Sequence, residues 1–337
     1  MSHIAVAHAT TPFISVYPWS NGFGTKLTNP STLPTGTGNG VRFSNDATRI
    51  VVAHSTTPFV SAYPWSNGFG TKLANPLTLP NGTGLNVAFT PNGNQVAISH
   101  VTSPRVSVYQ WSSGFGSRYS NPSTPPSGDG RAVEFSPSGT HVAVAHPTSP
   151  RVSAYPWGPS FGTKYANPGT LPANDGNDVS FSPSGNDIAV GHYVSPNVSV
   201  YPWSSGFGTK YANPSPGLAG ESRVRFSPDG ATIAFAHHLS PRIAAYPWSS
   251  GFGTKYADPS ILPTGNGWDI AFSQNGADVA VVHDSSPIIS VYPWSSGFGT
   301  KYANPATLPT GDGNGVAFSS PSAPFKPYWL RPQTQIL

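Results

Sequence analysis

The sequence repeats one pattern seven times at an almost constant interval, and this repetition constrains the fold more than any other feature. Versions of "YPWSSGFGTKYANP" recur along the chain, each marked by its tryptophan: Trp19, Trp65, Trp111, Trp157, Trp203, Trp248 and Trp294. Successive tryptophans are 46 residues apart, except for the 45 residues between Trp203 and Trp248. Such a period predicts a repeat architecture, in which the connecting loop after Tyr211 has lost one residue.

Each unit is predicted to contain four short strands. Examples are "RAVEF" (131–135), "HVAVAH" (141–146) and "RVSVYQW" (105–111), the last with clear period-two alternation, followed by a weaker strand around "TKY" (209–211). No window shows the 3.6-residue apolar spacing of a helix over a useful length. Four strands in a repeat of 40–50 residues are typical of one blade of a β-propeller.

The phase of the repeat predicts how the ring closes. The chain opens with a second strand, "HIAVAH" (3–8), and its last repeat strand, "GVAFS" (315–319), is a first strand. Pairing of these two strands would complete a blade and remove the open sheet edges that invite aggregation. We therefore expect an all-β, seven-bladed β-propeller of four-stranded antiparallel blades over residues 1–319. An extended tail rich in proline and aromatic residues follows at 320–337.

Two resemblances follow from the repeated wording. The frame "FSPSG…IAVAH…VSVYPW", between Phe181 and Trp203 in one copy, resembles the WD40-like propeller superfamily, although the Gly-His and Trp-Asp dipeptides of that family are lacking. The wording "YPWSxGFGTKxANPxTLPxGxGNGVAF" looks like that of repeat proteins encoded by tailed bacteriophages. The resemblance implies a non-enzymatic structural or interaction protein of a virion, in its capsid, tail or fibre. A carbohydrate-binding lectin or a propeller that binds a host receptor is the alternative.

Composition excludes several other classes. The chain has no cysteine, so neither disulfides nor thiolate sites contribute, and its net charge of +4 is spread without a basic run for nucleic acid. No apolar stretch is long enough for a membrane helix, and the first residues lack the features of a secretory signal. We expect a protein of the virion, extracellular after lysis. The thirteen acidic residues are scattered without a spacing for acid–base work, so neither an enzyme nor a cofactor or metal site is predicted.

The repeated aromatic residues have two interpretations. In "VSVYPW", alternation sends Tyr201 and Trp203 to one face of the blade and Val198 and Val200 to the other. Both faces of a blade are covered by neighbouring blades, so packing between blades is the favoured interpretation. A ring of aromatic platforms for sugars is the alternative.

One histidine per unit ends each second strand: His8, His54, His100, His146, His192, His237 and His283. These imidazoles are candidates for a ligand or partner face, although a sevenfold ring spaces them too widely to coordinate a single ion. Hydrogen bonding to a loop of the same or the next blade is the simpler interpretation. His3, His141 and His238 are out of phase with the repeat and are expected to be surface variation.

The loops that lead into the first strands differ from unit to unit, and loops on a rigid scaffold are the usual place for recognition. Their distinctive residues are candidates for the same ligand face: Arg131, Asp175, Asp178, Glu221, Arg223 and Trp268. The tail supplies candidates for docking: Phe325, Tyr328, Trp329 and Leu330, among four prolines. Predicted partners are other virion proteins, contacted through the tail, or a bacterial surface glycan. Packing of the tail under its own propeller is the alternative.

Overall fold

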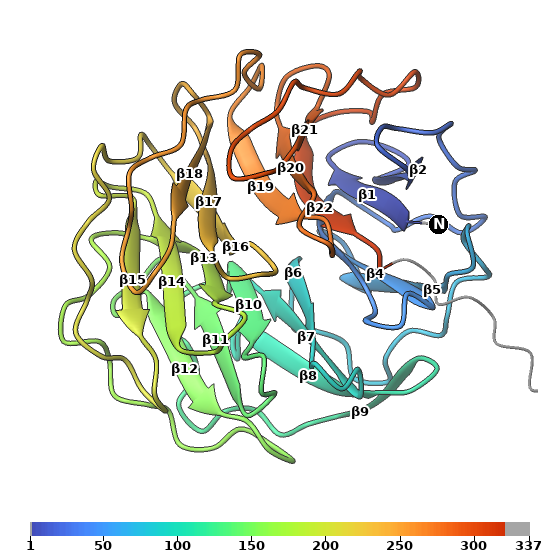
Figure 1. The fold of residues 1–337 in the computed structure, drawn as a ribbon. Helices are drawn as coiled ribbons and strands as arrows, with labels where there is room; N and C mark the ends of the chain where they lie inside the picture. The colour runs from blue at the N-terminus through green and yellow to red at the C-terminus, as the bar shows by residue number, and fades with distance from the viewer. Residues whose placement is uncertain (1, 321–337) are drawn as a thin grey trace, which may run out of the picture.

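A computed structural model describes residues 2–320, whose regular elements are 22 β-strands in seven antiparallel sheets. The sheets form a ring (Figure 1). The inner strands are β3 (Gly38–Phe43), β6 (Gly84–Phe89), β10 (Ala132–Phe135), β13 (Gly176–Phe181), β16 (Ser222–Phe226), β19 (Gly267–Phe272) and β22 (Gly313–Phe318). The middle strands are β1 (Ser2–His8), β4 (Arg49–His54), β7 (Gln95–His100), β11 (His141–Ala145), β14 (Asp187–His192), β17 (Thr232–His237) and β20 (Asp278–His283). The outer strands are β2 (Ile14–Trp19), β5 (Val60–Pro64), β8 (Val106–Trp111), β12 (Val152–Pro156), β15 (Val198–Pro202), β18 (Ile243–Pro247) and β21 (Ile289–Pro293), and β9 (Phe115–Arg118) adds a fourth strand to one blade.

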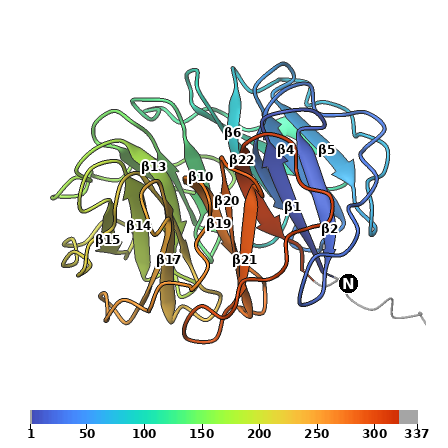
Figure 2. The ribbon, with the colours of Figure 1, turned by 90° about the horizontal axis from the view of Figure 1, so that it is seen from above.

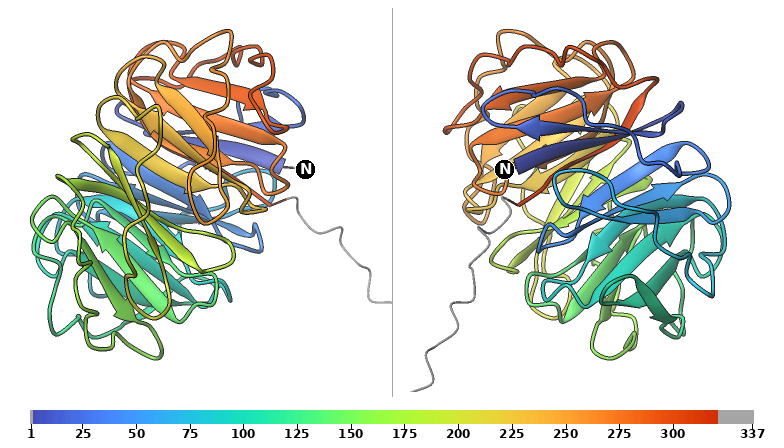
Figure 3. Two further views of the ribbon diagram at one scale, coloured as in Figure 1. Left: turned by 60° about the vertical axis from the view of Figure 1, so that its left-hand side comes forward. Right: turned by 90° about the vertical axis from the view of Figure 1, so that its right-hand side faces the viewer.

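The ring closes as the phase of the repeat predicts. Strand β22, from the end of the repeat, pairs antiparallel with β1 and places Phe318 opposite Ile4 and Val316 opposite Val6. The first and last strands of the propeller therefore lie in one sheet, in the order β2-β1-β22 (Figure 3). The inner strands contact one another in cyclic order (Figures 1 and 2). The two cavities that their side chains line form a central channel. This confirms the seven-bladed β-propeller.

The repeated aromatic residues pack between blades. Tyr17 is fully buried and Trp19 is 5% exposed. The Trp19 ring meets Phe23 of its own blade edge-on, and also Tyr302 of the neighbouring blade, whose amide donates to the carbonyl of Val291 on β21, at centroid distances of 5.1 Å in each case. The same arrangement recurs around the ring, so these aromatic side chains form the core and are not platforms exposed to sugars.

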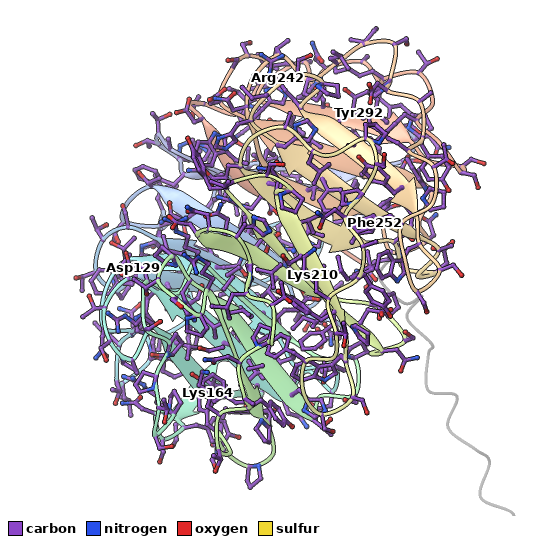
Figure 4. All side chains as sticks on the ribbon, turned by 90° about the vertical axis from the view of Figure 1, so that its left-hand side faces the viewer. Asp129, Lys164, Lys210, Arg242, Phe252 and Tyr292 are labelled. Carbon is purple, nitrogen blue, oxygen red and sulfur yellow. The ribbon has the colours of Figure 1, made fainter. Side chains whose placement is uncertain are left out.

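The expected fourth strand is regular only in the blade that contains β8 and β9; in the other six blades the fourth segment meets the outer strand at a single bridge, as Phe23 meets Trp19. In those six, the outer strand carries proline at the position of Gln110, as in the Tyr17-Pro18-Trp19 segment. The Pro18 carbonyl accepts a hydrogen bond from the amide of Gly24, so the backbone at this position faces the fourth segment. Proline has no N–H to donate in return, whereas Gln110 does. Figure 4 shows the outside of the propeller, where Lys164 and Lys210 of these fourth segments lie.

Replacing Gln110 with proline is therefore expected to abolish β9 and to lower the free energy of unfolding by about 1 kcal/mol, the net value of one backbone hydrogen bond. Denaturant unfolding measures the difference. Gln110→Ala is the matched control, because it keeps the N–H and removes only the side chain. Equal losses in both variants would contradict this explanation of the irregular fourth strand.

Most inner strands begin with a β-bulge, which puts one unpaired residue at the start of the channel. The register shifts identify these residues as Asn39, Leu85, Asn177, Trp268 and Asn314, and Arg131 holds the equivalent place before β10. Strand β16 has no shift, because Ser222 pairs with His237 and Arg223 directly with Ala236. The residue missing from the short unit is therefore its bulge residue.

A glycine precedes the bulge wherever the bulge is present. A Cβ atom on Gly38 would lie 2.2 Å from the carbonyl oxygen of Phe13 in the neighbouring blade, so a side chain does not fit there. In the unit without a bulge, Ser222 takes the place of this glycine, and its hydroxyl donates a hydrogen bond to the carbonyl of Asn197. The local backbone of this one unit therefore differs from that of the other six.

Candidate functional site

A cavity of about 420 Å³ lies at the start of the channel, where the inner strands begin. Its rim carries the bulge residues Asn39, Leu85, Asn177, Trp268 and Asn314 together with Arg131. Glu221 and the next residues along the inner strands also line it: Asn86, Asp178, Arg223 and Asp269. We call this space the first cavity, and its volume is within the range of small-molecule sites.

Glu221 is at the centre of a mostly buried cluster in the first cavity. One carboxylate oxygen accepts a hydrogen bond from Nη1 of Arg223 at 2.7 Å, and the other lies 3.7 Å from Nδ1 of His238. The ring of Trp268 closes the cluster, since its centroid is 4.5 Å from that of His238 and 5.7 Å from the guanidinium carbon of Arg223. A carboxylate, a guanidinium, an imidazole and an indole thus meet within one site.

The short unit explains how this cluster forms. Glu221 directly precedes β16 and Arg223 is its second residue, and the hydrogen bond between them shows that their side chains meet on one side of Ser222. In the other units a glycine and a bulge residue separate the two equivalent positions, such as Asn266 and Asp269. Loss of the bulge residue therefore brings an acid and a base together at one point of the ring.

The environment determines the charge of these groups. Burial by itself would raise the pKa of Glu221, but the charge and hydrogen bond of Arg223 outweigh burial and hold the pKa below its usual range. Burial lowers the pKa of His238, and the nearby Glu221 carboxylate only partly opposes that shift. At neutral pH the cluster therefore holds an ionised Glu221 beside a neutral His238.

Arg131 contributes a second guanidinium on the rim. Its Nη2 lies 3.0 Å from a carboxylate oxygen of Asp175, and its Nη1 donates a hydrogen bond to the side-chain oxygen of Asn177. The Arg131 side chain is 32% exposed, so it remains accessible from the first cavity. An anionic group entering the cavity would therefore meet two arginines, Arg131 and Arg223.

Two buried amide atoms that line the first cavity lack a partner among the described residues. These atoms are Oδ1 of Asn86 and Nδ2 of Asn177. A buried polar atom without a hydrogen bond costs free energy, and both of these atoms are shielded from solvent.

Arg225 separates the first cavity from the rest of the channel. Its guanidinium lies 2.8 Å from Asp178 and 3.8 Å from Asp269, and these carboxylates also accept hydrogen bonds from the amides of Val224 and Val316. Although burial disfavours its charge, the two carboxylates raise the pKa of Arg225. Both acids therefore join neighbouring inner strands and neutralise Arg225, and they form the floor of the first cavity.

The structure brings most of the loop candidates together. Arg131, Asp178, Glu221, Arg223 and Trp268 all line the first cavity, and Asp175 is bound to Arg131 beside it. The four tail candidates, Phe325, Tyr328, Trp329 and Leu330, lie outside the described residues.

The seven repeated histidines do not lie on the predicted ligand face: His8, His54, His100, His146, His192, His237 and His283 are 0–1% exposed. In six blades the Nε2 atom is hydrogen-bonded to a serine hydroxyl on the outer strand, as in His8 with Ser15 at 3.0 Å. The loop that follows each middle strand turns back toward the histidine, as the hydrogen bond from the amide of His8 to the carbonyl of Phe13 shows. Hydrogen bonding within the blade therefore accounts for these residues.

Sequence reasoning missed His238, Asp269 and Arg225. His238 was expected to be surface variation, yet its ring is packed against Trp268 and is close to Glu221. Its place directly after the repeated His237, in the only unit that is one residue short, was the signal available in the sequence. His3, also expected at the surface, is buried against Trp65.

Within residues 2–320, no group of three or more histidine and acidic side chains is arranged to hold a metal ion. Among the same residues there is no helix long and apolar enough to span a bilayer.

The chain superposes over nearly its whole length on solved propeller structures. Two are described as "putative 6-phosphogluconolactonase": one from Bacteroides uniformis (16% identity, TM-score 0.72, covering 94% of this chain and 99% of the other) and one from Bacteroides fragilis (13%, 0.74, 95% and 98%). A third is the periplasmic gluconolactonase of Pseudomonas aeruginosa (15%, 0.73, 95% and 99%). No protein-family model and no curated protein sequence matches the chain. At these identities the likeness shows a shared seven-bladed propeller fold.

These neighbours correct two predictions. The prediction of a non-enzymatic virion component, with a lectin or receptor-binding propeller as its alternative, was wrong, because three solved structures that match nearly the whole chain are described as gluconolactonases, two of them as putative 6-phosphogluconolactonases. The prediction that the protein is not an enzyme was wrong for the same reason. The WD40-like and bacteriophage wording of the repeat is matched by no family model and remains a resemblance.

Proposed function

We infer that the protein is a lactonase that hydrolyses the cyclic ester of a sugar acid in the first cavity. The observation that carries this proposal is the cluster of Glu221, Arg223, His238 and Trp268, which joins an ionised carboxylate to a guanidinium and an aromatic face. The gluconolactonase names of the structural neighbours support the same reaction class.

The cluster suits the chemistry of ester hydrolysis. Glu221 takes a proton from a water molecule whose oxygen attacks the lactone carbonyl carbon. The guanidinium of Arg223 stabilises the negative charge that develops on the carbonyl oxygen. The ring C–O bond then breaks, and the leaving alkoxide takes the proton back from Glu221, so one lactone and one water give one hydroxy acid.

Other residues of the first cavity suit the binding of a sugar derivative. The indole of Trp268 offers an apolar face to a sugar ring, and the side-chain amides of Asn39 and Asn314 line the same cavity. Arg131 lies on the rim, where it can pair with an anionic substituent distant from the reacting ester.

The test is the hydrolysis of glucono-δ-lactone and its 6-phospho derivative, followed as acid release above the spontaneous rate. We expect catalysis of at least one lactone by the unaltered chain. Arg131→Gln should raise KM for the phosphorylated lactone about tenfold or more, the value of one charge-assisted hydrogen bond. The change in KM for the unphosphorylated lactone should be small.

The control is Asp129→Asn, which alters an exposed acid on the loop that leads into β10 and should leave both rates unchanged (Figure 4). If the folded chain hydrolyses neither lactone faster than the spontaneous reaction, the proposed function is refuted. Equal changes in KM for the two lactones in Arg131→Gln would refute the role of Arg131 alone.

A further inference from the structure

A second cavity, of about 370 Å³, lies at the opposite end of the channel, where the inner strands end. Asn45, Pro228 and Gln274 line it, together with the edges of phenylalanines from six blades: Phe43, Phe89, Phe135, Phe226, Phe272 and Phe318. The charged side chains of Arg42, Glu134 and Arg225 also line it. None of the chemistry proposed for the first cavity uses this space.

The second cavity exists because small residues alternate with charged ones around the channel. The residue just before the inner-strand phenylalanine is, in ring order, Arg42, Ala88, Glu134, Ser180, Arg225, Ala271 and Ala317. Long side chains at only three of the seven positions leave the centre of the ring unfilled. An apolar wall around a few charged groups is the usual construction of a small-molecule site.

The three charged residues are not equivalent. Arg225 is neutralised by Asp178 and Asp269 from the side of the first cavity. Arg42 lies within 4.0 Å of no carboxylate among the described residues, and its Nη1 donates only to the backbone carbonyls of Val41 and Val316. The second cavity therefore contains one guanidinium whose charge is not paired.

Glu134 does not supply the missing negative charge in full. Burial raises the pKa of its carboxyl to about 7, against the opposing effect of Arg225. Near neutral pH a large share of Glu134 is therefore protonated, and a protonated carboxyl can donate a hydrogen bond. A positive group and a hydrogen-bond donor thus face one apolar space.

We propose that the second cavity binds an apolar carboxylate, a molecule whose anionic end pairs with Arg42 and Glu134 and whose apolar body lies against the phenylalanine wall. The unpaired charge of Arg42 would be neutralised by an anionic group, and the phenylalanines would pack against an apolar body. Arg225 with its two aspartates divides this site from the first cavity, so the two sites bind separate ligands.

The test uses 2-naphthoate and octanoate as probes, with binding measured by isothermal titration calorimetry on the full chain. At least one probe should bind with 1:1 stoichiometry, and the uncharged 2-naphthamide should bind at least tenfold more weakly than 2-naphthoate. Arg42→Gln should weaken binding of the carboxylate at least tenfold, since it removes the cation. Ala88→Leu should abolish binding by filling the space and should retain the fold, because the added side chain enters a cavity.

Glu221→Gln, in the first cavity, is the matched control and should bind the probes as the unaltered chain does. Three results would overturn the proposal: no saturable binding of either carboxylate, unchanged affinity in both Arg42→Gln and Ala88→Leu, or loss of binding in Glu221→Gln. The last result would place the probe in the first cavity. Thermal melts of each variant establish that the fold is retained, and Ala88→Leu still decides the matter if Arg42→Gln does not fold.

Discussion

Acidification from pH 7 to pH 4 is expected to unfold the propeller in one cooperative transition with a midpoint between pH 6 and pH 4. The cause is the set of buried histidines that end the middle strands, one in each blade. Burial lowers the pKa of each to about 4, below the usual value of 6.5. The folded chain therefore binds fewer protons than the unfolded chain throughout this interval.

The sign of the effect follows from this difference in proton binding. Well above pH 6.5 the histidines are neutral in both states, and they contribute no pH dependence. As pH falls from 6.5 toward 4, each histidine costs the folded state roughly 1 kcal/mol per pH unit. Seven such residues together cost several kcal/mol per unit, and a typical domain has only about 5–15 kcal/mol of stability in total.

Tryptophan fluorescence and circular dichroism across the pH range would measure the transition. His54→Gln should move the midpoint to lower pH and make the transition shallower by about one proton, because glutamine can donate to Ser61 without titrating. Asp129→Asn, on an exposed loop, should leave the midpoint where it is. A chain that keeps its native fluorescence at pH 4 would show that these histidines tolerate protonation in the fold.

Glu221→Gln is expected to lower kcat for lactone hydrolysis by roughly 100-fold or more, which is the usual contribution of a general base. Glutamine has nearly the same shape and can still accept the hydrogen bond from Arg223, but it cannot take a proton from water. KM should therefore change little. Steady-state kinetics on the lactone that the unaltered chain hydrolyses best would measure both constants, with Asp129→Asn again as the control acid.

The dependence on pH distinguishes catalysis by Glu221 from a structural role. Because the pKa of Glu221 is held below its usual range, the reactive carboxylate persists as pH falls, and the rate should decline only where the fold itself fails. An unchanged kcat in Glu221→Gln would exclude Glu221 as the base and leave the lactonase proposal without its central residue.

Sequence reasoning could predict the ring because the repeat states its own period and phase. The interval between tryptophans and the strand types at the two ends were sufficient for seven blades and for the pairing of β1 with β22. The same reasoning failed at the fourth strand, because a single proline facing the fourth segment, such as Pro18, matters more than the strand-like residues that follow it.

The candidate site was predicted in part, for a physical reason. Arg131, Glu221, Arg223 and Trp268 stood out because they vary where other residues repeat, and variation near the inner strands marks a place where blades need not be alike. Asp269 and Arg225 were missed because they lie inside strands, where a charged residue is neutralised by a neighbour far away in the sequence. That pairing depends on the closed ring and is not visible in any one unit.

The functional class could not be read from the repeat at all. The residues that recur seven times, such as Tyr17 and Trp19, are buried between blades. Their repetition therefore reflects packing between blades and does not indicate which reaction or ligand the protein has. The histidines misled for the same reason, because regular spacing suggests a designed face when the true requirement is a hydrogen bond to a serine such as Ser15.

The missing bulge residue of the short unit has a consequence beyond the cluster it creates. Seven equal blades would make the mouth of the channel look the same after each rotation by one blade, and a small asymmetric molecule would have seven equivalent ways to bind. The omission after Ser222 removes that equivalence. Arg131 then lies two blades before this point and Trp268 one blade after it, so the mouth acquires a direction around its circumference, and a substrate has a single orientation in which to bind.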